Sequence, residues 1–139
     1  MNEERVARAL GWFSIGLGLT EFVAGRALGR SLGMEDRTGL IRAFGLREIS
    51  AGVGILSQPR PTGWMWARVA GDAMDLAALG SACTSDNPER DNVAAAIGAV
   101  AGITAIDIWC AWRLGNRYYL KTRGMPAESG RPVEVAASP

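Results

Sequence analysis

Four apolar blocks, each close to the length of a membrane-spanning helix, constrain this chain more than any other sequence feature. They cover residues 6–25, 40–57, 63–82 and 93–114. A helix that rises 1.5 Å per residue needs about 20 apolar residues to cross about 30 Å of hydrocarbon. The segments between the blocks are polar and contain Gly, Pro, Asn and Asp, which favour turns. The sequence therefore predicts an all-α fold, an integral membrane four-helix bundle.

Two other interpretations compete with membrane insertion. A soluble four-helix bundle needs a polar face on every helix, and the blocks at 6–25 and 93–114 contain too few polar residues to form one. A cleaved secretory leader would explain the first block, because the small residues around Val23-Ala24-Gly25 resemble a cleavage site. However, an acidic segment precedes this block and three further apolar blocks follow it. We therefore favour a multi-pass membrane protein.

The length of 139 residues fits a single domain. We predict a transmembrane domain over residues 1–119 and a disordered cytoplasmic tail over residues 120–139, because the tail is rich in Pro, Gly and Ser. The link at 26–39 is predicted to be polar and interrupted by glycines, with at most a helical turn. Residues 57–63 contain two prolines and are predicted to form a tight turn.

The third apolar block contains three charged residues, although charges at membrane depth are costly and normally face a partner inside the protein. Arg68, Asp72 and Asp75 are spaced i, i+4, i+7 and therefore share one stripe of a helix. Other blocks contribute charges at similar depth, so that a polar charged seam is expected inside the bundle. Its predicted members are Glu21, Arg47, Glu48, Arg68, Asp72, Asp75 and Asp107.

Depth along the helices divides this charged seam into two layers. Nearer the chain termini, Arg68 is expected to pair with Asp107 and also with Asp72. In the other layer, Arg47 is expected to pair with one of three acids: Glu21, Glu48 or Asp75. Because the seam has five acids and two arginines, at least one acid is expected to be protonated or solvated at neutral pH.

Positive charges and tryptophans predict an orientation for the bundle. With four spans, both termini and the turn at 57–63 lie on one side, and that side has more Lys and Arg than the other. The positive-inside rule therefore places both termini in the cytoplasm, with the bundle in a bacterial inner membrane. Five tryptophans near the same side predict an interfacial aromatic belt or a docking surface for a partner: Trp12, Trp64, Trp66, Trp109 and Trp112.

Small residues spaced four apart predict close helix packing. Gly98 and Gly102 continue such a ridge on the fourth block, and Gly71 lies on another in the third block. Four helices cannot use all of these ridges internally. We therefore expect a homo-oligomer or association with another membrane protein, besides contact with membrane lipid.

The sequence lacks the common motifs of catalysis, cofactor binding and nucleic-acid binding. It has no His, Walker loop, Rossmann fingerprint, GxSxG or HExxH motif, and its net charge is only +1. Cys83 and Cys110 are expected at opposite ends of the bundle, which excludes a disulfide between them. Asp72 and Asp75 have the spacing to hold a hard cation, but Arg68 on the same stripe favours an ion pair. We predict no catalytic residue, metal or cofactor, although a lipid or other amphiphile could bind.

Three segments of the chain resemble a family of small bacterial four-span membrane proteins, over approximately residues 5–115. The resemblance is carried by the motifs Gly45-Leu46-Arg47-Glu48-Ile49 and Arg68-Val69-Ala70-Gly71-Asp72-Ala73-Met74-Asp75-Leu76. Members of this family often bear a cyclase/dehydrase name, because relatives occur with START-like polyketide-cyclase domains. This chain has neither the strands nor the length for a START-like domain. The resemblance thus implies a four-span fold without an enzymatic activity.

These observations lead to one main functional hypothesis and two alternatives. The main hypothesis is a non-catalytic integral membrane protein, a structural or accessory subunit that self-assembles or joins a larger membrane complex. The first alternative is a pathway for protons, ions or small solutes through the charged seam. The second is the binding of a lipid, quinone or pigment whose head group contacts Arg47 or Arg68.

Overall fold

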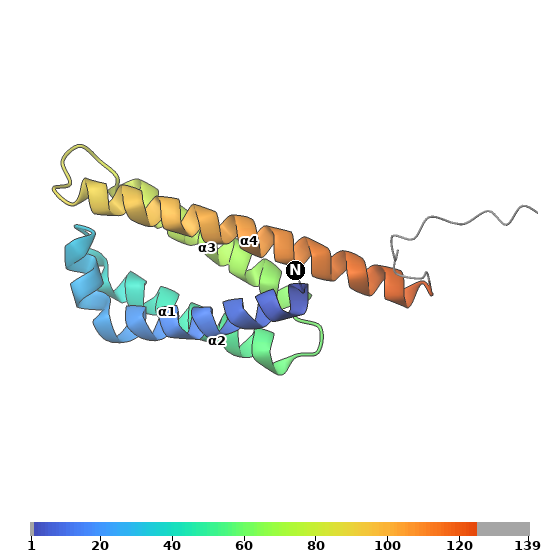
Figure 1. The fold of residues 1–139 in the computed structure, drawn as a ribbon. Coiled ribbons are helices and arrows are strands. Elements are labelled where there is room, and N and C mark those ends of the chain that lie inside the picture. The colour runs from blue at the N-terminus through green and yellow to red at the C-terminus, as the bar shows by residue number, and fades with distance from the viewer. Residues whose placement is uncertain (1, 125–139) are drawn as a thin grey trace, which may run out of the picture.

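Two antiparallel helical hairpins make up the protein in the computed structural model, which describes residues 2–124 (Figure 1). Within these residues there are four α-helices, a short 3₁₀ turn and no strand, which confirms the all-α prediction. The elements are α1 (Glu3–Ser31), η1 (Glu35–Arg37), α2 (Thr38–Ser57), α3 (Thr62–Ala82) and α4 (Arg90–Thr122).

The two hairpins are α1 with α2 and α3 with α4, and contacts within each hairpin exceed those between them. The N-terminus and the α2–α3 turn lie at one end of the bundle, which we call the terminal end, and α4 runs past them and ends beyond that end (Figure 1). The α1–α2 and α3–α4 connections lie at the opposite end, the connection end. Four helices that run antiparallel in sequence have their ends arranged in this way.

Two predicted boundaries are wrong. Most of the link at 26–39 is helical, because α1 continues to Ser31 through residues that favour helix, and it ends where Gly33 adopts a φ of 62°. Ala24 has non-helical angles (φ −99°, ψ 17°), so α1 is kinked where its predicted span would have ended. Helix α4 also continues past residue 119 to Thr122. From residue 125 onward, the predicted tail lies outside the described residues.

Glycine permits the close approach of α1 to α2. A Cβ atom added at Gly18 would collide with the carbonyl oxygen of Gly45, and one added at Gly45 would collide with that of Gly18. The predicted ridge of Gly98 and Gly102 has no such role, because a Cβ at either position would meet nothing within 4 Å in the described part of the chain. Helix α4 turns this face away from the other described helices, so the use of this ridge between chains stays a prediction.

Buried apolar residues form one core at each end of the bundle. The terminal core consists of Ala7, Leu10, Ile55, Met65, Cys110, Ala111 and Leu114. The connection core consists of Met34, Leu79, Ala82 and Val93. The charged seam lies between these two cores, so the apolar interior of the bundle is divided in the middle.

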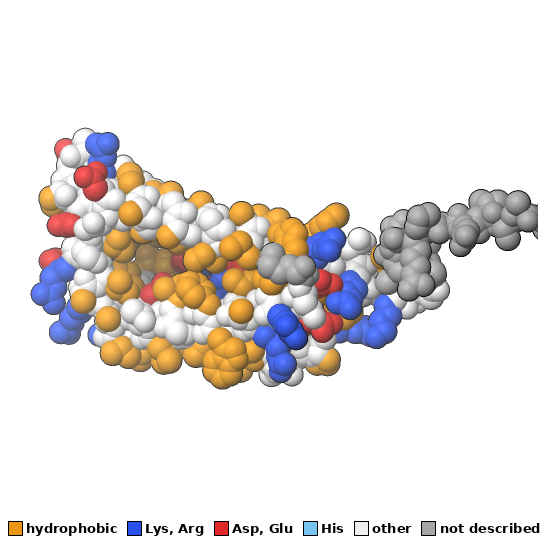
Figure 2. Space-filling view, in the orientation of Figure 1, with side chains coloured by type: hydrophobic (Ala, Val, Ile, Leu, Met, Phe, Trp, Pro, Cys, Tyr) orange, Lys and Arg blue, Asp and Glu red, His pale blue; other side chains and the backbone are white. Residues whose placement is uncertain are grey.

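The outside of the bundle is also apolar. Large hydrophobic side chains are exposed on all four helices, among them Val23, Leu46, Met74 and Ile106. On the face shown in Figure 2, charged side chains gather mainly at the two ends of the bundle, and hydrophobic side chains lie along the length between them. A surface of this kind matches a bilayer better than it matches water.

Two helices, α1 and α4, are long and apolar enough to cross a membrane. Only 22% and 17% of their apolar windows are buried inside the protein, whereas the core helix of a soluble protein would be mostly buried. Helices α2 and α3 do not meet the same test, and each contains three charged residues. Crossing by all four helices therefore stays a prediction.

Candidate functional site

The centre of the charged seam is an ion-pair chain that joins three helices. Arg68 of α3 donates from Nη1 to Oε2 of Glu48 on α2, at 2.8 Å. The same guanidinium donates from Nε to Oδ2 of Asp107 on α4 at 3.0 Å, and its Nη2 lies 2.9 Å from the same oxygen. All three side chains are at most 1% exposed. Charge-assisted bonds of this geometry are strong, and here they are shielded from solvent.

Ser14 connects this ion-pair chain to α1, the one helix that contributes no charged residue to it. Its hydroxyl lies 2.6 Å from Oε2 of Glu48 and 2.8 Å from the Glu48 backbone carbonyl, with both oxygens placed to accept. Ser14 is completely buried. Because Glu48 also binds Arg68, one carboxylate contacts side chains of both hairpins.

Arg47 forms a second ion-pair chain beside the first. Its Nη2 lies 2.9 Å from Oε1 of Glu48 and 2.8 Å from Oδ2 of Asp75, and its Nη1 donates to the Gly71 carbonyl at 2.9 Å. A Cβ at Gly71 would lie 2.7 Å from the Arg47 guanidinium carbon. Gly71 therefore provides the space through which Arg47 reaches α3. Gly71 thus makes room for an arginine side chain, whereas the sequence predicted that it belongs to a ridge of small residues on which another helix packs.

The structure brings together some of the pairs that the sequence predicts. Arg68 contacts Asp107, and Arg47 contacts both Glu48 and Asp75. The division into two separate layers is wrong, because Glu48 binds Arg47 through one oxygen and Arg68 through the other.

Asp72 does not form the expected pair with Arg68, and Glu21 is the one of the three alternative partners of Arg47 that Arg47 does not bind. Asp72 accepts a hydrogen bond from the Thr104 hydroxyl at 3.0 Å, because the Arg68 guanidinium extends toward Glu48 and Asp107. Among residues 2–124, neither Asp72 nor Glu21 has a cation within 4.0 Å. Two acids of the seam are thus left without a positive partner in the described structure.

Several buried oxygens of the seam also lack a hydrogen-bond donor. Within the described residues these atoms are Glu21 Oε2, Asp75 Oδ1 and Asp107 Oδ1. A buried acceptor without a donor is costly, and such atoms often mark the place of a water, proton or ligand. Glu21 and Asp75 both face the cavity described next.

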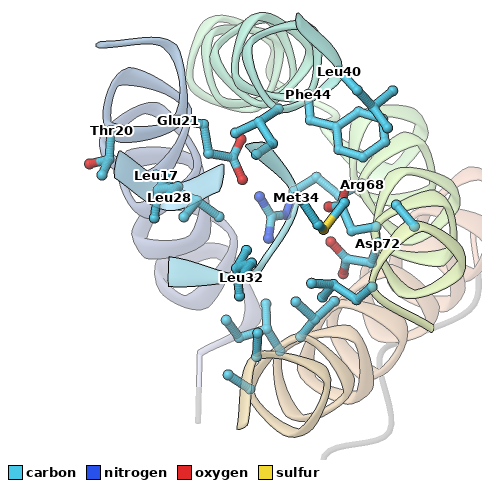
Figure 3. A pocket seen from close by; sticks show the side chains of 18 of the residues that line it. Leu17, Thr20, Glu21, Leu28, Leu32, Met34, Leu40, Phe44, Arg68 and Asp72 are labelled. Carbon is cyan, nitrogen blue, oxygen red and sulfur yellow. The ribbon is translucent and has the colours of Figure 1, made fainter. Parts of the chain in front are cut away.

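An apolar pocket of about 310 Å³ lies between the seam and the connection core, and all four helices line it. Its walls include Leu17, Leu28, Phe44, Val100 and Ile103. Its charged lining residues are Glu21, Arg68, Asp72 and Asp75. The close-up shows Glu21, Arg68 and Asp72 directed into the cavity from the surrounding helices (Figure 3). The space-filling view shows the hollow between the two hairpins (Figure 2).

This pocket was not predicted from the sequence. Its wall residues are ordinary members of the apolar blocks, and no spacing distinguishes them from neighbours that face outward. The excess of acids in the seam was the only available signal. It indicated unpaired carboxylates, but it did not indicate an adjacent cavity.

The five tryptophans do not form one uniform surface. Trp12, Trp66 and Trp112 are 66%, 46% and 61% exposed. Trp64 and Trp109 are half-buried and pack against the terminal core. The three exposed tryptophans are suited to an interfacial aromatic belt or to contact with a partner. Trp64 and Trp109 instead contribute to the packing of the terminal core.

Glu48, Asp72 and Asp75 each place a carboxylate oxygen within 4.8 Å of the other two, the spacing of a candidate metal site. Both oxygens of Glu48 already bind arginines, and one oxygen of Asp75 binds Arg47. Ion pairing therefore explains the positions of Glu48 and Asp75, and Asp72 accepts a hydrogen bond from Thr104. The two cysteines are free, and Cys110 is fully buried in the terminal core.

Comparison with protein-family models, curated proteins and solved structures finds no match for this chain. The resemblance to small four-span membrane proteins therefore stays a prediction, and the functional argument depends on the geometry of the seam and the pocket.

Proposed function

We propose that this chain is a non-catalytic, multi-pass integral membrane protein that binds a small amphiphile between its two helical hairpins. The observation that carries the proposal is the pocket of about 310 Å³, which combines apolar walls with a charged floor. Ligand pockets are typically of this kind, mostly apolar with a few converging polar groups. The apolar outer surface supports a location in lipid, with both termini in the cytoplasm by the positive-inside rule.

The charged seam is better suited to ligand binding than to the passage of protons or ions. A pathway for protons or ions would have to continue from the seam to both ends of the bundle. Toward the terminal end, the seam meets the terminal core, in which Met65, Cys110 and Leu114 have no exposed surface. The seam is therefore better suited to hold the hairpins together and to form the polar floor of a site.

Mass spectrometry of co-purified ligands tests this function. The protein is extracted from membranes in mild detergent, and bound small molecules are compared with those of an Ala96→Phe variant. Ala96 lines the pocket, so a phenylalanine there occupies ligand space. Ala95→Phe is the matched control, because Ala95 is exposed and does not line the pocket.

We expect a ligand with wild type and Ala95→Phe that is depleted in Ala96→Phe. Equal ligand content in all three proteins would contradict binding in this pocket. Thermal unfolding of each protein establishes that the comparison is made between folded chains.

A second function, an accessory subunit of a membrane assembly, is favoured by the unused face of α4. Gly98 and Gly102 are open to approach by another helix. Cross-linking in native membranes tests this function with a Gly98→Leu variant. The proposal predicts cross-linked wild-type protein and loss of the product in the variant, and a wild-type chain that stays monomeric would contradict it.

A further inference from the structure

We infer that the amphiphile is a cation, an apolar molecule with an ammonium-type head held by Glu21, Asp72 and Asp75. This inference rests on the proposed binding function and specifies its ligand class. The three carboxylates line the pocket, and they project from α1 and from α3. A head group between them would contact both hairpins.

The charge balance of the pocket floor favours a cation. Arg68 is its only positive lining residue among those described, and Arg68 already binds Glu48 and Asp107. Of the three lining carboxylates, only Asp75 has an arginine partner, Arg47. An anionic head group would add a further negative charge to this floor in an environment of low dielectric, where repulsion is strong.

Hydrogen-bonding capacity points to the same head group. Glu21 Oε2 and Asp75 Oδ1 are buried acceptors without donors in the described structure. Asp72 receives one bond, from Thr104. A primary ammonium has three donors and no acceptor, so it could satisfy acceptors on both helices. A quaternary ammonium would supply charge without these hydrogen bonds.

The walls and volume define the remainder of the ligand. Leucine, phenylalanine, valine and isoleucine side chains line the same space as the carboxylates, and the labelled leucines and Phe44 lie on several sides of it (Figure 3). A volume of about 310 Å³ lies at the low end of the range of ligand pockets, about 300–1,000 Å³. The pocket therefore suits one medium-length alkyl chain or a small ring system, and a two-chain lipid exceeds it.

Three probes with the same tail separate charge from hydrophobicity: decylammonium, decanol and decanoate. Each is titrated onto the purified full-length chain in nanodiscs, with empty nanodiscs as the reference for partition into lipid. Binding is measured by ligand-observed NMR and by the shift of the thermal unfolding midpoint. We expect decylammonium to bind at least about tenfold more tightly than the other two, the effect of one charge-assisted interaction.

Glu21→Gln tests the carboxylate that holds the head. Glu21 takes part in no ion pair among the described residues, so this isosteric variant leaves the ion-pair chains intact. We expect it to weaken decylammonium binding by about tenfold while decanol binding stays unchanged. Glu35→Gln is the matched control, because Glu35 is an exposed glutamate outside this pocket. This variant is expected to bind all three probes as wild type does.

The outcomes distinguish the two proposals. If all three probes bind equally, and Ala96→Phe abolishes their binding, the pocket is a binding site but the inference of a cation is wrong. If decylammonium binds equally to wild type and to Glu21→Gln, the assignment of the head-group site is also wrong. If no probe binds beyond lipid partition, both the inference and the proposed pocket fail.

Discussion

Glu48 and Arg68 form an ion pair of 2.8 Å between the two hairpins, and each side chain is only 1% exposed. Glu48 receives a further bond from Ser14 of α1, and Arg68 a second carboxylate from Asp107 of α4. This single pair therefore connects directly to all four helices. In the proposed membrane location, where burial of apolar surface gives no driving force between helices, such polar contacts would specify which helix faces are internal.

Replacing Glu48 should destabilise the bundle more than replacing any exposed acid. Glu48→Gln leaves Arg68 with one carboxylate and Arg47 with only Asp75, and breaking a buried pair in this way costs about 3–5 kcal/mol. Reversible unfolding in mixed detergent micelles measures the loss.

A double-mutant cycle measures the free energy of interaction between Glu48 and Arg68 apart from their other contacts. Arg68→Met combined with Glu48→Gln should lower the free energy of unfolding by less than the sum of the two single changes. The reason is that no uncompensated Arg68 charge remains in the double variant. Additive costs would show that the two side chains do not stabilise each other. Glu35→Gln, at an exposed position, provides the baseline and should have little effect.

Adding one methyl group at Gly45 should separate α1 from α2. Its Cβ would collide with the Gly18 carbonyl oxygen, and overpacking of this kind costs about 1–3 kcal/mol. The same change at Gly102 meets open space and should leave the monomer's stability unaltered or slightly improved. Unfolding of Gly45→Ala and Gly102→Ala in the same detergent compares them. Equal stability of the two variants would contradict the close contact of α1 and α2.

The stability of the terminal end should decrease in acid. Glu3 precedes the first predicted span, and its pKa lies below the ordinary 4.5, chiefly through its backbone N–H and further through Arg117 at 2.8 Å. Because this pKa is lowered in the folded state, ionised Glu3 contributes to the free energy of unfolding above its ordinary pKa. The contribution is lost as the pH falls through the pKa of the folded state. Because Arg117 is half exposed, the pair contributes at most about 1 kcal/mol.

Glu3→Gln should remove this part of the pH dependence. Unfolding of wild type and variant is compared in detergent at neutral pH and at acidic values. The two proteins are expected to converge as the pH falls. A stability difference that stays constant down to the lowest pH would contradict the assignment to Glu3 ionisation.

The two ends of the bundle should be accessible from opposite sides of the membrane. Ser85 lies exposed in the α3–α4 connection, and Asn116 lies exposed on α4 toward the terminal end. In a background without native cysteines, Ser85→Cys should react with a membrane-impermeant maleimide added to intact cells. Asn116→Cys should react only after the cells are opened. Reaction of both variants from outside would contradict the four-span topology.

The native cysteines provide an internal check of the fold. Cys110 is fully buried in the terminal core, whereas Cys83 is partly exposed at the end of α3. In the detergent-solubilised protein, a maleimide should modify Cys83 first and Cys110 only on unfolding.

The sequence by itself determined the helices and the charges that share their inner faces. Block length and apolar composition are local properties, so residues 40–57 and 63–82 closely anticipate α2 and α3. The pairing of Arg68 with Asp107 also followed from the sequence, because helical rise fixes depth and a buried charge requires a partner. Apolar composition does not mark the ends of α1 and α4, since polar residues such as those at 26–31 also form helix.

Only the tertiary structure decided how these helices combine. The rotation of each helix about its axis determines that Glu48 serves two arginines, that Asp72 binds Thr104, and that Gly98 faces outward. Spacing along one helix does not encode the direction in which a long arginine side chain extends. The pocket likewise depends on the tertiary structure, because residues of both hairpins line it. The two hairpins contact each other less than the two helices within each hairpin do, and the space between them adjoins carboxylates without a cation.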